Sequence, residues 1–182
     1  MRPKDFWMLS HLGGETRMPQ EFNMQEAICE AIQTEKDVMD FYKKAASITQ
    51  NERAKKVFLT LANEEREHAS HFFHLYTGSD LGSFDQFMAR PPRDASAMLH
   101  NLTKALEADT NERKAMELAL KEEEDLAKNL RHTAAQIVDP AVRTVFERMA
   151  KETDDHFQLI ESEYAHLMGM VHETDIDTFV RE

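Results

Sequence analysis

The feature that most constrains the fold is an internal repeat. Residues from about 23 to 76 recur further along the chain without insertion or deletion, so that His68 is matched by His156, 88 residues later. Chance explains a few coincidences among alanines and glutamates, but not a shared Val-Phe pair and a histidine at the same offset. We therefore infer two copies of one supersecondary unit. The identical pairs include Ala27/Ala115, Ala31/Ala119, Glu35/Glu123, Asp37/Asp125, Ala46/Ala134, Val57/Val145, Phe58/Phe146, Ala62/Ala150, Glu64/Glu152, His68/His156 and Tyr76/Tyr164.

Each copy has the signals of two consecutive helices. The whole chain of 182 residues contains five glycines and five prolines, which favours long helices over a sheet with many turns. Asn23, Asn51 and either Thr110 or Asn111 are suitable N-caps, and Pro140 suits a first helical position. The sequence thus predicts helices over about 23–49, 51–77, 111–138 and 140–168.

These helices predict an all-α protein with one domain. Residues 78–110 contain Gly82, Pro91 and Pro92, and form a long crossover between two helical hairpins. Each hairpin can bury the apolar stripe of the other, which predicts an antiparallel four-helix bundle over residues 21–168. Residues 1–20 are expected to form an irregular arm and residues 169–182 a short tail. The alternative is an extended helical pair that serves for association.

Charge and cysteine content exclude several classes of function. The formal net charge is −12, and no basic stripe is present, so we expect no nucleic-acid partner. The chain has one cysteine, Cys29, which excludes an internal disulfide and suits a reducing cytoplasm. We find neither a signal peptide nor an apolar stretch of membrane-spanning length, so we expect a cytoplasmic protein without membrane contact.

Ionisable residues interrupt the apolar seams that the helices should bury. A bundle helix buries residues at alternating spacings of three and four, and each predicted seam contains an acidic residue or a histidine near its middle. Because an ionised carboxylate in a dry core costs roughly several kcal/mol, this cluster needs positive charge. The interrupting residues are Glu35 in the first helix, Glu65 and His68 in the second, Glu123 in the third and His156 in the fourth.

A metal ion is the simplest source of that charge. Glu65 and His68 are three residues apart, so both can reach one ion from the same helix face. Carboxylates mixed with imidazoles suit iron, manganese or zinc. The alternative is a buried hydrogen-bonded network without metal.

Over residues 23–168 these features resemble the rubrerythrin-like branch of the ferritin-like superfamily. That pattern has one glutamate from each of two helices and a Glu-x-x-His motif from each of the other two. Here Glu35 and Glu123 match the single glutamates, and Glu65-Arg-Glu-His68 matches one motif. The resemblance implies a ferritin-like bundle that binds one or two iron ions through Glu35, Glu65, His68, Glu123 and His156.

The fourth helix departs from the family pattern. Thr153 occupies the position of the second motif glutamate, a residue that bridges the two ions of a di-iron site in this family. Its loss leaves a single-metal site, an asymmetric pair or an alternative ligand, for which Glu152 is a candidate although it lies off the seam. Leu126 replaces a further glutamate of full rubrerythrins. Tyr42 lies two turns after Glu35 and could hydrogen-bond to a ligand.

The resemblance implies an iron-dependent oxidoreductase that reduces peroxide or oxygen, or that oxidises ferrous iron. The chain lacks the cysteine-rich rubredoxin module of full rubrerythrins, so an external electron donor is expected, and the family often forms homodimers. One alternative is a metal-binding, sensing or structural bundle, with zinc for example, that has no turnover. Another is a scaffold protein with a degenerate site.

Overall fold

The structure of the chain is a computed structural model that describes residues 22–94, 96–108 and 112–169. The expected arm (1–20), residues 170–182 of the expected tail, and the cap candidates Thr110 and Asn111 lie outside the described residues. Within the described ranges all regular structure is helical. The helices are α1 (Met24–Ile48), α2 (Glu52–Phe73), α3 (Phe84–Met88), α4 (Ala97–Ala108), α5 (Glu112–Gln136) and α6 (Pro140–Leu167).

Side-chain caps define where three of the long helices begin. The Asn23 side chain accepts hydrogen bonds from two backbone N–H groups in the first turn of α1, and Asn51 does the same for α2. Asp139 caps α6, with Pro140 at the first helical position, where a missing N–H costs nothing. Asn51 and Asp139 occupy equivalent positions in the two halves of the repeat, so the repeat preserves the starting point of the second helix in each hairpin.

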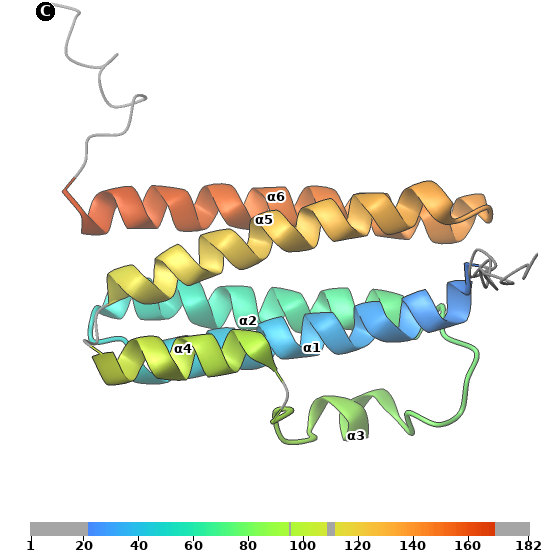
Figure 1. The fold of residues 1–182 in the computed structure, drawn as a ribbon, viewed down its shortest axis with the longest axis horizontal. Helices are drawn as coiled ribbons and strands as arrows, with labels where there is room; N and C mark the ends of the chain where they lie inside the picture. Colours follow the sequence, from blue (N-terminus) through green and yellow to red (C-terminus); the bar gives the residue numbers. More distant parts are fainter. Residues whose placement is uncertain (1–21, 95, 109–111, 170–182) are drawn as a thin grey trace, which may run out of the picture.

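The long helices form two hairpins, α1–α2 and α5–α6, that lie alongside each other (Figure 1). The crossover contains α3 and α4, and α4 runs alongside α1 (Figure 1). This arrangement confirms the predicted all-α, ferritin-like helical bundle. None of the helices in the described ranges has the length and apolarity required to cross a bilayer.

The core lies between the two hairpins. Each long helix contributes an apolar stripe of the predicted spacing, and Tyr42, Phe58 and Phe146 are among its largest fully or almost fully buried side chains. Full burial of a side chain of this size contributes roughly 1.5–3 kcal/mol. The resulting rigid frame holds the polar residues at the middle of the bundle in place.

Helix α1 is buried on its outer side as well. Val38 and Phe41 lie outside the predicted seam yet are 2% and 0% exposed, and α1 packs against α4 of the crossover as well as against α2. The buried Lys36 forms an ion pair with Asp40. On the same outer side, Arg93 of the crossover forms an ion pair with Asp37 and attaches the crossover to α1.

Candidate metal centre

The five residues that the sequence analysis selected as ligands all lie in the interior of the bundle. Glu35 projects from α1, Glu123 from α5 and His156 from α6, while α2 contributes both Glu65 and His68. None is more than 5% exposed. Four helices thus bring three carboxyl groups and two imidazoles into a region that is otherwise apolar.

Glu65 lies between the two imidazole rings. Its Oε2 atom lies within hydrogen-bond distance of His68 Nδ1, at 3.2 Å, and its Oε1 atom lies 3.0 Å from His156 Nδ1. The rings are nearly parallel, with their centroids 5.1 Å apart and an interplanar angle of 10°. One ligand atom from each of the three residues can be chosen so that all lie within 4.8 Å of one another. Glu65, His68 and His156 therefore form a candidate metal site.

Glu35 and Glu123 lie on either side of this group. Glu35 Oε2 is 3.9 Å from His68 Nδ1, and Glu123 Oε1 is 3.7 Å from His156 Nδ1. The arrangement follows the sequence repeat, because each histidine has a glutamate from the first helix of the corresponding hairpin beside its inward-facing nitrogen. The structure brings all five predicted residues into one cluster around the Glu65 carboxylate.

The charges of the cluster shift the pKa values in opposite directions. Burial alone would raise the pKa of Glu65, but His156 and His68 outweigh it and lower this pKa to about 2. Burial alone would lower the pKa of His156, but Glu123 and Glu65 raise it to about 11. Burial and the charge of Glu65 raise the pKa of Glu35 well above its usual value. Burial also raises the pKa of Glu123, although His156 opposes this effect. Without metal, an ionised Glu65 thus lies beside the imidazolium of His156.

Several polar atoms of the cluster have no hydrogen-bond partner among the described residues. They include His156 Nδ1, which is close to Glu65 but not aligned for a hydrogen bond. A buried polar group without a partner costs roughly 1–3 kcal/mol, so several at one point indicate a missing ligand. A cation coordinated by oxygen and nitrogen would satisfy them together, and the residues present fit a metal ion. These atoms are Glu35 Oε1 and Oε2, Glu65 Oε1, Glu123 Oε2 and His156 Nδ1.

Thr153 makes the two halves of the site unequal. It is fully buried at the position that corresponds to Glu65 in the repeat. Its hydroxyl donates a hydrogen bond of 2.9 Å to the carbonyl of Met149, one turn earlier on α6. The hydroxyl is therefore directed towards its own helix, and α6 supplies one histidine without a bridging carboxylate.

Tyr42 makes a contact that the sequence analysis assigned only in general terms. Its fully buried hydroxyl donates a hydrogen bond to Glu123 Oε1, across the bundle, and not to Glu35 on its own helix. Burial and the charge of Glu123 raise the pKa of Tyr42 well above its usual value. Tyr42 therefore remains protonated and fixes one carboxylate oxygen of Glu123, while the other oxygen stays free for a ligand.

Sequence reasoning missed the partners on the outer side of the histidines. Glu152 Oε2 is 3.0 Å from His68 Nε2, and Glu64 Oε2 is 2.9 Å from His156 Nε2. The Glu152 carboxylate therefore contacts the outer nitrogen of His68, on the side of the ring away from Glu65. The identity of Glu64 and Glu152 within the repeat was the signal that could have revealed this role.

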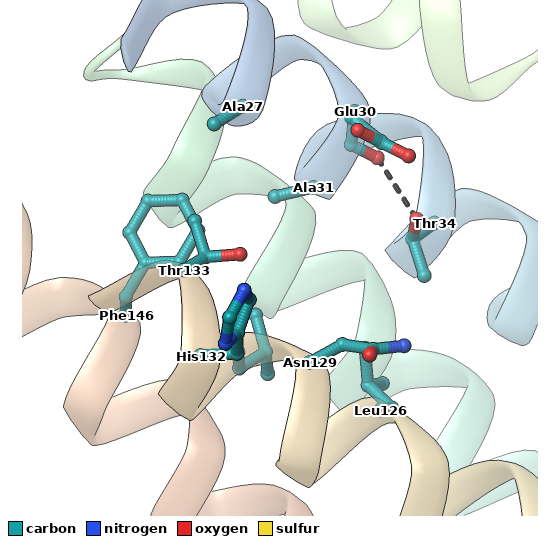
Figure 2. A pocket seen from close by; sticks show the side chains of 10 residues that line it. Ala27, Glu30, Ala31, Thr34, Leu126, Asn129, His132, Thr133 and Phe146 are labelled. Atoms are coloured by element: carbon teal, nitrogen blue, oxygen red, sulfur yellow. Dashed lines mark hydrogen bonds between the residues drawn. The ribbon is translucent and has the colours of Figure 1, made fainter. Parts of the chain in front are cut away.

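Two of the pockets on the surface of the described residues have similar volumes. One, of about 300 Å³, lies between α2 and α6 and is lined by His68, His156 and acidic residues. The other, also of about 300 Å³, lies between α1 and α5. Figure 2 shows Ala27, Ala31 and Thr34 from α1 facing Leu126 and Asn129 from α5 across this second pocket. It contains none of the five predicted ligands, so the acidic pocket is the one that reaches the histidines.

Comparison with known proteins identifies the family of this chain. The family model described as rubrerythrin matches residues 26–164. A solved structure, described as a hypothetical protein from Pyrococcus furiosus, superposes with a TM-score of 0.59 at 19% identity, and the match covers 83% of this chain and 94% of that one. A comparison with curated proteins gives no match. The structural likeness concerns the fold alone, whereas the family match spans all four long helices, and the chain therefore belongs to the rubrerythrin family.

Proposed function

We propose that this protein binds one or two iron ions through Glu35, Glu65, His68, Glu123 and His156, and that it acts as an oxidoreductase toward peroxide or oxygen. The observation that supports this most directly is the set of buried, unpartnered oxygen and nitrogen atoms that converge around Glu65. Iron held by this mixed set of ligands would supply one-electron chemistry toward peroxide or dioxygen.

The protein residues have distinct roles in this proposal. Glu65 has one carboxylate oxygen near each imidazole, so it could bind an ion beside either histidine. Tyr42 holds Glu123 in one orientation through its hydroxyl. The five candidate ligands are at most 5% exposed, and this shielding from bulk water strengthens their electrostatic interactions. The chain has one cysteine, which cannot form a multi-cysteine iron centre, so the proposed electron donor is external.

The test is to load the purified protein with ferrous iron under anaerobic conditions and then to add oxygen or peroxide. We expect bound iron, and either ferrous oxidation above the buffer rate or peroxide turnover with a supplied reductant. Glu65→Gln should lose most of the bound iron. Glu163→Gln is the matched control, because Glu163 is a buried carboxylate of α6 that pairs with Arg53 instead.

The outcomes separate metal binding from catalysis. Iron binding without oxidation or turnover would contradict the oxidoreductase assignment. Absence of metal from the wild-type protein, or equal binding by the Glu65→Gln variant, would contradict the metal centre itself. Loss of iron in the Glu163→Gln control would show that burial of charge, and not ligation, determines metal content.

A second candidate function is a structural or sensing metal site without turnover. Thr153 supports this second function. With Thr153 in place of a glutamate, α6 supplies a single imidazole and no carboxylate that could bridge a symmetric pair of ions. Zinc, which has no redox chemistry, would suit such a role. A single redox-silent ion per chain, together with a large fall in thermal stability on chelation, would favour this function over the oxidoreductase.

A further inference from the structure

The outer nitrogens of the two histidines contact carboxylates in a crossed arrangement. Glu64 of α2 approaches His156 of α6, and Glu152 of α6 approaches His68 of α2, at 2.9 and 3.0 Å. Each glutamate is four residues before a histidine on its own helix, yet it contacts the histidine of the other helix. The two contacts therefore join the hairpins where α2 and α6 meet.

The sequence repeat argues against an accidental origin of these two contacts. The four residues form two equivalent pairs, since Glu64 and His68 recur as Glu152 and His156. Both histidines have the same orientation, with Nδ1 toward Glu65 and Nε2 toward the outer glutamate. The same contact between a glutamate and a histidine Nε2 atom thus occurs in both halves of the repeat. Freely solvated acidic side chains would not be expected to repeat it.

The chemistry of imidazole explains why such a contact matters. A neutral imidazole that binds a cation through Nδ1 carries its remaining proton on Nε2. A carboxylate that accepts this N–H fixes the tautomer and the ring orientation, and it makes the ligating nitrogen more basic. His68 and His156 are only 3% and 5% exposed, and the outer glutamates lie at their Nε2 atoms.

We propose that Glu64 and Glu152 are crossed positioning residues, which hold the Nε2 atoms of His156 and His68 so that both Nδ1 atoms face the metal beside Glu65. This inference rests on the proposed metal-binding function. The two glutamates line the acidic pocket between α2 and α6 and are 44% and 41% exposed, so they hold the histidines from the solvent side.

The pocket itself provides a matched control. Glu67 and Asp155 line the same pocket, and Asp155 pairs with Lys151 of its own helix at 2.8 Å. The double variants Glu64→Ala/Glu152→Ala and Glu67→Ala/Asp155→Ala remove the same charge from the same pocket. They differ in whether a carboxylate at the imidazole nitrogen is lost. All four side chains are at least partly exposed, so truncation leaves no core cavity.

The first experiment is a Co²⁺ titration followed by visible absorption, which reports both affinity and ligand geometry. Loss of Glu64 and Glu152 should weaken Co²⁺ binding about 10–100-fold and alter the spectrum. The Glu67/Asp155 variant should keep the wild-type spectrum and most of the affinity. Glu64→Gln/Glu152→Gln should recover part of the loss, because the amide oxygen still accepts from Nε2–H.

The second experiment tests the crossing directly. In the Zn²⁺-loaded protein, nitrogen NMR of labelled histidine reports the tautomer and hydrogen bonding of each ring. Glu152→Ala should perturb His68, and Glu64→Ala should perturb His156. Perturbation of the histidine on the same helix would overturn the crossed assignment.

The two proposals can fail separately. Variants at Glu64 and Glu152 that bind Co²⁺ like the Glu67/Asp155 control would overturn the positioning role, while wild-type metal binding would still support the centre. A wild-type protein that binds neither Co²⁺ nor Zn²⁺ would overturn the metal centre and the positioning role with it.

Discussion

Tyr42→Phe isolates the contribution of the hydrogen bond between Tyr42 and Glu123. The substitution removes one hydroxyl and leaves the ring, which stacks on Phe58 with centroids 6.0 Å apart, so packing should change little. Glu123 already has one oxygen without a hydrogen-bond partner among the described residues, and the variant would remove the hydrogen bond of the second one, which keeps only the 3.7 Å contact with His156 Nδ1. A lost hydrogen bond to a buried carboxylate costs roughly 1.5–3 kcal/mol, so we expect the metal-free protein to lose about 2 kcal/mol of stability.

Denaturant unfolding measures this difference, and the m-value should stay constant because the exposed surface does not change. For a chain of this size, about 2 kcal/mol corresponds to a fall in Tm of about 4–8 °C. Tyr164→Phe is the control: its hydroxyl donates to Glu117 at 3.1 Å, and the Glu117 side chain is 30% exposed. Water replaces that bond, so the control should lose much less than Tyr42→Phe.

A double-mutant cycle with Glu123→Gln tests whether the cost comes from this pair. If the hydrogen bond is the cause, the coupling energy between the two positions should account for most of the loss in Tyr42→Phe. Equal losses for Tyr42→Phe and Tyr164→Phe, or a coupling energy near zero, would refute the reasoning. Such a result would mean that Glu123 finds another partner when the hydroxyl is removed.

Three further predictions concern the metal and the crossover. Thr153→Glu adds a carboxylate at a fully buried position, so it should increase the amount of metal bound per chain and lower the Tm of the chelator-treated protein. Elemental analysis checks the first effect and thermal melts check the second. Removal of metal from the wild-type protein should lower Tm, since a ligand at a thousandfold excess over its Kd stabilises the folded state by about 4 kcal/mol; unchanged melting with and without chelator would contradict this. Arg93→Ala should destabilise the protein by roughly 1–3 kcal/mol and speed proteolysis of residues 78–96, because the buried Asp37 loses its cationic partner, and equal proteolysis rates would contradict this attachment of the crossover.

Much of the interior could be predicted because helical periodicity is a local property. Spacings of three and four residues place Glu35, Glu65 and Glu123 on the same stripe as the apolar core residues, and the structure buries all three. The repeat adds the pairing of hairpins, since neither copy can bury its stripe alone. These conclusions need no knowledge of which helix packs on which.

The outer face of α1 could not be predicted in the same way. The seam that predicts the inward residues leaves Lys36 and Asp40 on the opposite side of the helix, where charged residues normally meet solvent. They are nevertheless only 2% and 9% exposed, and α1 packs against α4, which lies more than fifty residues away in the chain. Burial there depends on a long-range contact, and no local period encodes it.

The sequence by itself determined the two repeated hairpins, the inward stripe of carboxylates and histidines, and the exchange of a glutamate for Thr153, because each follows from spacing along one helix or from identity between two. Only the tertiary structure decided which partners these residues meet. Tyr42 reaches Glu123 because α1 lies against α5. Glu64 and Glu152 each contact the histidine of the other helix because α2 packs against α6. Side-chain contacts between helices depend on the distance and rotation of whole helices, which no single helix specifies.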